Sequence, residues 1–196
     1  MPDVKHFDPD AALEQVERLF WRQGTAATSI QDVADATGLN RSSLYATFGG
    51  KRRLYRTALR RYLDERVLPA MRALAADDRG LTAIRAFFDA LIDLRCTGEF
   101  AGWGCMIVNA HVDPERDDPE VHAMLDEHHA ALRDALRSAL NTARAQGDLP
   151  PDASPEATAE TLALVAYGVN LRSRTGTPPE TLQATITAAL EPLSGR

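Results

Sequence analysis

Apolar residues recur at intervals of three and four along almost the whole chain, which is the spacing of one face of an α-helix. Leu13, Val16 and Phe20 form the first such stripe, and Gly24 follows it. Segments that alternate apolar and polar residues are missing, and runs of β-branched residues are few. The pattern therefore predicts an all-α protein.

Capping residues and glycines mark where the predicted helices begin and end. Asp8 before Pro9, and Ser154 before Pro155, are typical helix starts, because an Asp or Ser side chain accepts from the first free N–H groups and proline needs none. Pro69 falls inside one predicted helix and predicts a kink near residues 66–69. We predict nine helices, over about 8–24, 29–37, 40–48, 51–75, 81–95, 105–111, 118–146, 154–174 and 177–190.

The second and third predicted helices are short and surround Gly38, over residues 29–48. Leu44 and Phe48, four residues apart, give the third helix one apolar side. Its other side then carries Arg41, Ser42 and Tyr45. This partition suits a helix-turn-helix, in which one helix braces a second that enters the DNA major groove.

Charge is distributed unevenly along the chain. Residues 41–61 hold seven basic side chains and no acid, whereas the other 175 residues hold 15 basic and 28 acidic ones. A protein with a formal net charge of −6 that gathers positive charge in one helical segment is expected to meet a polyanion there. The basic segment begins inside the helix-turn-helix, so the expected polyanion is double-stranded DNA.

Residues 28–54 carry a recognisable pattern: Thr28-Ser-Ile-x-Asp-Val-Ala-x-Ala-Thr-Gly-Leu, then Ser-Ser-Leu-Tyr, Phe48, Lys51 and Leu54. This pattern resembles the DNA-binding region of TetR-family (tetracycline-repressor-like) transcriptional regulators. The resemblance covers roughly residues 8–66. It implies an all-α protein with a helix-turn-helix DNA-binding domain over 1–66 and a ligand-binding and dimerisation domain over 67–196. From the helical pattern alone, residues 77–80 are also a candidate boundary.

The resemblance also implies roles for individual residues in the N-terminal domain. Arg41, Ser42 and Tyr45 occupy positions that contact bases or flanking phosphates in this family. Gln31 occupies a position that reads a base in some members, and a glutamine pairs well with adenine. The positions that contact the DNA backbone are those of Thr28, Ser29, Thr47 and Lys51. Arg52, Arg53 and Arg56 are expected to be a mixture of phosphate contacts and ordinary surface.

The C-terminal part offers candidate residues for a small-molecule pocket, chosen as aromatic, sulfur-containing and polar side chains at helical spacing. The candidate ligand-binding residues are Phe87, Phe88, Leu91, Trp103, Cys105, Met106, Asn109, Met124, His128, Tyr167 and Asn170. We expect a homodimer on a palindromic operator, joined through the last two helices. The small residues Ala159, Ala163 and Ala166 and the apolar Leu182, Ile186 and Leu190 suit that interface.

The preferred function is a repressor that a small molecule releases from its operator, although the sequence does not say whether the ligand releases or promotes DNA binding. One alternative is a thiol-based redox or electrophile sensor that uses Cys105 and Cys96. A second is a small all-helical enzyme that uses Cys105 with His111 or His128. A third is an architectural DNA binder without a ligand. The size of residues 78–196 argues against that third alternative.

Other classes of site and location leave little trace in the sequence. His111, His122, His128 and His129 do not form a clear metal-binding constellation, and no nucleophile elbow, P-loop or zinc motif occurs. We therefore predict no cofactor and no catalytic residue. The N-terminus lacks the apolar core of a signal peptide, and no apolar run is long enough to cross a membrane. Two cysteines fit a reducing cytoplasm.

Overall fold

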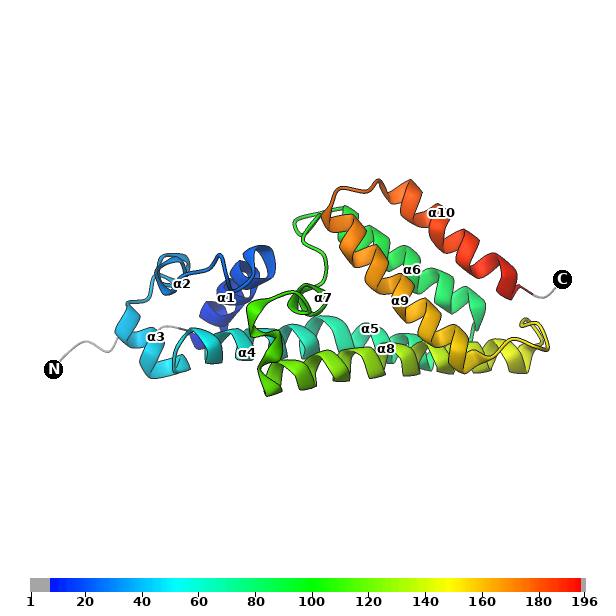
Figure 1. Ribbon diagram of the computed structural model, residues 1–196, viewed down its shortest axis with the longest axis horizontal. Helices are drawn as coiled ribbons and strands as arrows, with labels where there is room; N and C mark the ends of the chain where they lie inside the picture. Colours follow the sequence, from blue (N-terminus) through cyan, green and yellow to red (C-terminus); the bar gives the residue numbers. More distant parts are fainter. Residues whose placement is uncertain (1–7, 195–196) are drawn as a thin grey trace.

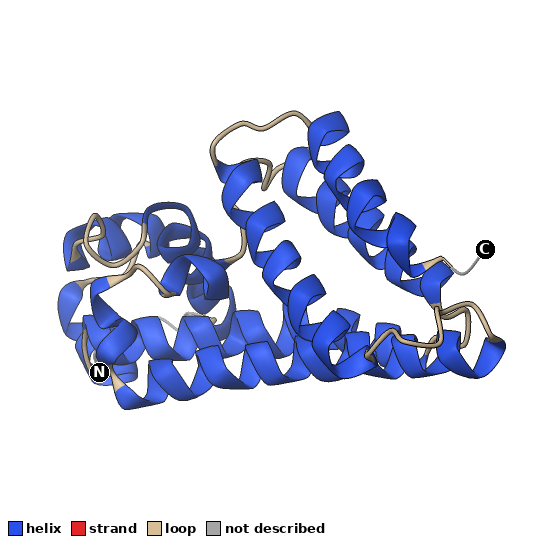
Figure 2. Ribbon diagram, turned by 45° about the vertical axis from the view of Figure 1, so that its right-hand side comes forward, coloured by secondary structure: helices blue, strands red, loops and turns tan. Residues whose placement is uncertain are grey.

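A computed structural model of the chain describes residues 8–194, and every regular element in that range is a helix, as predicted (Figure 2). Three short turns of other helix types occur: the π-helical η1 (Leu63–Val67) and the 3-10 turns η2 (Pro114–Asp117) and η3 (Glu191–Leu193). The α-helices are α1 (Pro9–Gln23), α2 (Ile30–Thr37), α3 (Arg41–Phe48), α4 (Lys51–Tyr62), α5 (Leu68–Ala76), α6 (Leu81–Cys96), α7 (Met106–Ala110), α8 (Pro119–Gln146), α9 (Pro155–Arg174) and α10 (Pro179–Leu190).

The helix starts follow the predicted capping chemistry. The Asp8 side chain accepts hydrogen bonds from the N–H groups of Asp10 and Ala11. Ser29 and Asp32 cap α2 reciprocally, since each side chain accepts from the other residue's backbone N–H. These contacts satisfy donors that have no partner inside the helix, and they set where α1 and α2 begin.

The helix predicted over 51–75 is a rod with a π-helical turn in its middle, in the order α4, η1, α5. The N–H of Leu68 donates to the carbonyl oxygen of Leu63, five residues earlier, and Pro69 follows in the first turn of α5. Proline lacks an N–H, so the ladder is interrupted here. The structure has this π-helical turn where the sequence predicts a kink. This turn is also why residues 8–194 hold ten α-helices where we predicted nine.

The molecule is elongated, with the short N-terminal helices at one end (Figure 1). α1 packs on α4, and α2 and α3 pack beside them. α5 and α8 lie side by side along the length of the molecule. At the other end α6 and α9 pack on them, and α10 packs on α6 and α9. One cluster of buried apolar side chains runs from Val16 in α1 to Leu190 in α10, so the two ends share a continuous core.

An aromatic cluster joins the N-terminal helices to the rest of the molecule. Trp21 of α1 packs on Tyr62, Phe100 and Trp103, with ring centroids 4.9 to 5.3 Å apart. Its Nε1–H donates to the carbonyl oxygen of Gly104 at 3.0 Å. Gly104 has a φ of 67°, and a Cβ there would lie 3.0 Å from the Asn170 carbonyl oxygen, so the close approach favours glycine.

Candidate nucleic-acid interface and ligand cavity

α3 presents its polar side to solvent and its apolar side to the core. Leu44 and Phe48 are buried, whereas Tyr45 is 54% exposed. Asn40 caps the helix by accepting from the Ser43 N–H, and the N–H of Gly49 donates to the Tyr45 carbonyl oxygen at the other end. The helix is thus fixed at both ends, and its exposed side is available to a groove of DNA.

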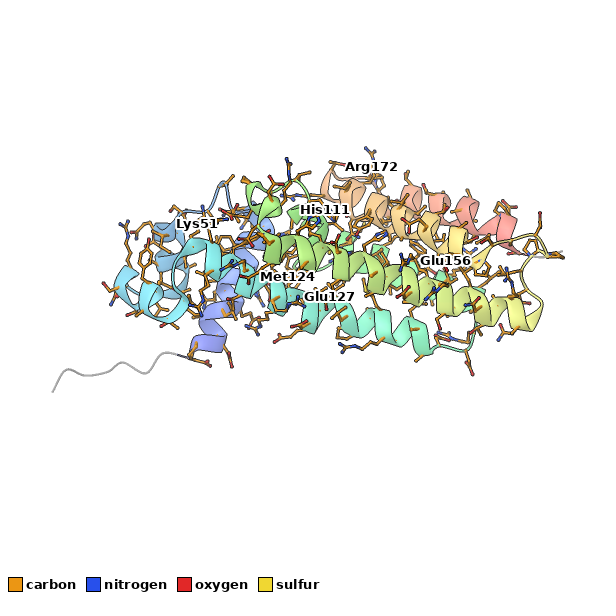
Figure 3. All side chains as sticks on the ribbon, turned by 60° about the horizontal axis from the view of Figure 1, so that its bottom comes forward. Lys51, His111, Met124, Glu127, Glu156 and Arg172 are labelled. Carbon is orange, nitrogen blue, oxygen red and sulfur yellow. The ribbon has the colours of Figure 1, made fainter. Side chains whose placement is uncertain are left out.

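Most of the side chains predicted to contact DNA lie on this end of the molecule. Ser29, Gln31, Arg41, Ser42, Tyr45 and Thr47 are exposed, and Lys51, at the start of α4, is half-buried (Figure 3). Thr28 requires a correction. It is buried, and its hydroxyl donates to the Gly24 carbonyl oxygen at 2.7 Å. This hydroxyl holds the turn between α1 and α2 and is not free for a phosphate.

Two of these residues form a single unit across α2 and α3. Arg41 donates from Nε and Nη2 to Gln31 Oε1, at 3.1 and 2.7 Å. The Gln31 amide nitrogen in turn donates to Asp35 Oδ1 at 2.7 Å. The sequence patterns treat Gln31 and Arg41 as separate readers. These hydrogen bonds instead hold Arg41 in a defined orientation. Gln31 must give up a hydrogen bond to Arg41 or Asp35 in order to bind a base.

Much of the basic segment is paired with acids of this chain. Arg52 contacts Glu115 at 2.7 Å and Asp118 at 3.3 Å, and Arg56 contacts the same Asp118 carboxylate. Arg60 pairs with Glu127 and Asp64, and Arg61 pairs with Glu65. Of the seven basic residues in 41–61, only Arg41, Lys51 and Arg53 make no ion pair with residues 8–194. The sequence predicts that Arg52 and Arg56 are either phosphate contacts or ordinary surface. Their ion pairs with acids of this chain are a third role, which that prediction does not include.

The acidic segment that supplies these partners also contacts α1. Asp113 accepts from the N–H and the hydroxyl of Thr25, at 2.8 and 2.5 Å, in a buried position. Asp118 caps α8 by accepting from the N–H groups of Glu120 and Val121. Burial raises the pKa of Asp118, but these N–H groups and the nearby arginines lower it more. Residues 113–120 therefore connect the DNA-facing helices to the start of α8.

A cavity of about 130 Å³ lies between α5, α6, α8 and α9. Its wall is mostly apolar, with a polar end formed by Arg95, Cys105, His128 and Asn170. Six of the predicted ligand-binding residues line it. These are Phe87, Leu91, Cys105, His128, Tyr167 and Asn170.

The other five predicted ligand-binding residues lie outside that wall. Phe88 and Met124 are buried in the core and do not line this cavity. Trp103 belongs to the aromatic cluster around Trp21. Met106 and Asn109 line a separate hollow beside the end of α1. These five residues are thus not part of this cavity's wall, since helical spacing alone does not say which side of a helix meets a cavity.

The wall also contains residues that the sequence patterns missed. Arg66, Val67, Ala70 and Met71 come from η1 and α5, which the sequence places only in a long connecting helix. The remaining ones are Ala90, Leu94, Arg95, Leu132 and Ala166. The π-helical turn brings α5 to the cavity, and the kink predicted by Pro69 is the one signal that pointed to this region.

The polar end of the cavity contains coupled groups. His128 Nδ1 lies 3.1 Å from the Tyr167 hydroxyl. Burial raises the pKa of the Cys105 thiol, but a hydrogen bond with His128 and the positive charge of Arg95 lower it to about 6. Cys105 and His128, one of the two suggested catalytic pairs, are thus together. The His111 ring instead packs against Tyr167, with centroids 5.5 Å apart.

A helix-turn-helix with an exposed reading side, joined to a helical body with a cavity, defines the class of one-component DNA-binding regulators. The comparisons name the family. A profile described as "Bacterial regulatory proteins, tetR family" matches residues 12–58, and one described as "Tetracyclin repressor-like, C-terminal domain" matches residues 80–189. The chain belongs to the TetR family of transcriptional regulators.

Individual relatives agree with this assignment. The chain is 31% identical to the HTH-type transcriptional repressor ComR of Escherichia coli over 91% of this chain and 85% of ComR. It is 32% identical to the uncharacterised regulator YezE of Bacillus subtilis, over 67% of each. It also resembles the solved structure of the TetR family regulator CifR, a cysteine mutant in complex with 26-bp operator DNA, with 27% identity, a TM-score of 0.82 and coverage of 97% and 98%.

These relatives make the chain a DNA-binding transcriptional regulator, and they do not favour the thiol-based alternative. Within residues 8–194, no group of three or more His, Cys, Asp or Glu side chains is arranged to hold a metal ion. In the same residues no helix has both the length and the apolar composition to span a membrane.

Proposed function

We propose that this protein is a homodimeric repressor that a small molecule, bound in the cavity between α5, α6, α8 and α9, releases from a palindromic operator. The observation that supports the proposal is the helical rod of α4, η1 and α5, which belongs to both the DNA-facing end and the cavity wall. Lys51 starts α4 at the DNA-facing end, and Val67 and Met71 line the cavity from η1 and α5. Twenty-six residues at about 1.5 Å each make this rod about 39 Å long. A ligand in the cavity therefore presses on the element that carries the DNA-facing helices.

The proposed division of labour places residues 1–66 in the DNA-binding domain and residues 67–196 in the ligand-binding and dimerisation domain. In DNA recognition, Arg41, Ser42, Tyr45 and Gln31 read bases or adjoining phosphates, and Ser29, Thr47 and Lys51 contact the backbone. The π-helical turn lies at the division. A π-helical turn is a common place for a helix to bend, so it suits a joint between the two domains.

The proposed dimer face is α9 with α10, but not through the side chains that the sequence suggested. Ala159, Ala163, Ala166, Leu182, Ile186 and Leu190 are all buried within one protomer. The outer side of α9 instead exposes Leu164 (59%) and Leu171 (48%), two turns apart on one side of the helix. Apolar side chains exposed in a row favour burial against a second copy. Glu156 and Arg172 mark the two ends of this helix in Figure 3.

Selection of DNA from a random library by the purified protein tests the proposal. We expect the selected sequences to contain an inverted repeat, bound by a dimer with strong salt dependence. A screen of small molecules against that selected DNA should then give compounds that lower its affinity for wild type. Sequences without two-fold symmetry, or a protein that stays a 21.4 kDa monomer at micromolar concentration, would contradict the proposal.

A further inference from the structure

Arg95 carries a positive charge into the interior without a carboxylate partner. It is 5% exposed, and its Nε donates to Asn170 Oδ1 at 2.6 Å. Its Nη2 donates to the Tyr62 hydroxyl at 3.3 Å, and its guanidinium carbon lies 5.9 Å from the centre of the Trp21 ring. Burial raises the pKa of Tyr62 well above its ordinary value, so that hydroxyl is neutral. All these contacts are to uncharged groups.

Arg66, the other arginine in the cavity wall, shows the usual arrangement, which is an ion pair with a carboxylate. It pairs with Glu17 at 2.6 Å, and its side chain is 34% exposed. Arg95 is more deeply buried, yet no Asp or Glu among residues 8–194 forms an ion pair with it. A buried charge is costly unless it is paired, so its surroundings are expected to supply an anion.

The guanidinium is held in place and has a donor to spare. Asn170 is itself fixed, because its amide nitrogen donates to the Ala166 carbonyl oxygen at 2.8 Å and its oxygen faces Arg95. Nε and Nη2 of Arg95 are engaged, while Nη1 makes no hydrogen bond within the described chain. Arg95 also lines the cavity. A planar guanidinium with free N–H groups is suited to a carboxylate.

The cavity limits the rest of the ligand. No Asp or Glu lines it, and its apolar lining includes Val67, Met71, Phe87 and Leu132. The second arginine in the wall, Arg66, is already paired with Glu17. Its volume of about 130 Å³ is close to that of a cavity that accommodates one benzene ring. We propose that the cavity binds a small monocarboxylate with a compact apolar body, whose carboxylate pairs with Arg95. This inference rests on the proposed function of the cavity and names the chemical class of its ligand.

Cys105 is the group that competes with such a ligand. Its thiol lies at the same end of the cavity, among Arg95 from α6, His128 from α8, Tyr62 from α4 and Tyr167 from α9. A thiolate there is the one negative charge that the wall itself can supply. A carboxylate beside Arg95 favours the neutral thiol. Removal of the thiol is therefore expected to preserve or strengthen carboxylate binding.

The test uses benzoate and its neutral counterpart benzamide as probes of the full-length protein, by titration calorimetry without DNA. We expect wild type to bind benzoate about tenfold or more tightly than benzamide. Arg95→Met should reduce benzoate binding to the level of benzamide and leave benzamide binding unchanged within threefold. Arg95→Lys should keep part of the preference. Cys105→Ala should bind benzoate as tightly as wild type or more tightly.

Thermal melting supplies a second readout of benzoate binding. Benzoate should raise the melting temperature of wild type and not that of Arg95→Met. Equal binding of benzoate and benzamide, or loss of benzoate binding in Cys105→Ala, would overturn the proposal.

The experiments distinguish failure of the anion site from failure of the proposed function. If benzoate binds through Arg95 without changing operator affinity, the anion site stands and its regulatory role fails. If only neutral compounds bind in the cavity and release the operator, the anion site fails and the regulatory role stands.

Discussion

The DNA-facing end and the ligand cavity differ in how the chain builds them. At the DNA-facing end, the side chains proposed to contact DNA come from one stretch of 23 residues, Ser29 to Lys51, and most stand exposed on two short helices. The cavity wall comes from η1, four α-helices and the residue that precedes α7, and its members are spread over more than 100 positions. A site formed by one short segment appears in the sequence as a pattern with fixed spacing. A cavity instead depends on which sides of distant helices face each other.

The largest expected effect comes from loss of the dimer. A dimer binds both half-sites of the operator at once, so two weak contacts combine into strong binding. Leu164→Asp with Leu171→Asp should give monomers, because a carboxylate on this side of α9 opposes burial against a second copy. Operator affinity should fall by about a hundredfold or more. Light scattering and fluorescence anisotropy measure both effects. Ala73→Asp is the control, since Ala73 is exposed on α5 and lies outside both the cavity wall and α9. A dimeric double variant would show that the interface lies elsewhere.

The next largest effect separates sequence reading from charge. Arg41→Ala should cost about 1–3 kcal/mol on the operator and weaken its preference over scrambled DNA. Lys51→Ala should weaken both duplexes equally and reduce the salt slope by about one. Arg52→Ala should leave the slope unchanged, because Arg52 is paired with Glu115 and Asp118. A reduced slope for Arg52→Ala would mean that the paired arginines also contact DNA.

The buried contact between Thr25 and Asp113, which joins the DNA-facing helices to the segment before α8, is tested through the free energy of unfolding. Thr25→Ala removes the hydroxyl that donates to the buried Asp113 carboxylate and should lower the free energy of unfolding by about 1–3 kcal/mol. Thr57→Ala is the control, because its hydroxyl donates only to the Arg53 carbonyl oxygen within an exposed helix turn. Chemical denaturation of the three proteins gives the comparison. Equal losses for the two variants would mean that the Thr25 contact has no special weight.

The smallest effect concerns pH at the polar end of the cavity. The pKa of Cys105 in the folded protein is about 6, below its ordinary value of 9.0. A lowered pKa stabilises the fold above the unfolded pKa, and this contribution is lost as pH falls toward 6. The stability advantage of wild type over Cys105→Ala should therefore grow between about pH 6 and pH 9. A difference that stays constant over this range would show that the thiol keeps its ordinary pKa.

The sequence predicts the elements well because their signals are local. Asp8 and Ser154 cap the helices that they were expected to start, and Pro69 marks the interruption of the rod. These residues act on neighbours within one turn, so their effect does not depend on the rest of the fold.

Partners supplied by distant parts of the chain are what the sequence does not reveal. Arg52 and Arg56 look like a basic surface until the fold brings residues 115–120 beside them. Arg95 is absent from the predicted ligand-binding residues, yet it lines the cavity and is buried against Tyr62 and Asn170. Charge patterns along a sequence show where charge is, and the fold decides what it meets.

The central claim is that the cavity and the operator are coupled through the rod of α4, η1 and α5. Ala166→Phe tests it most directly, since Ala166 is buried in the cavity wall and a phenyl group there occupies the space of a ligand. We predict that this variant stays dimeric, binds a single half-site like wild type, and binds the full palindromic operator about 5–150-fold more weakly, the range of typical coupling free energies. A folded, dimeric Ala166→Phe protein whose full-operator affinity equals that of wild type would contradict the account.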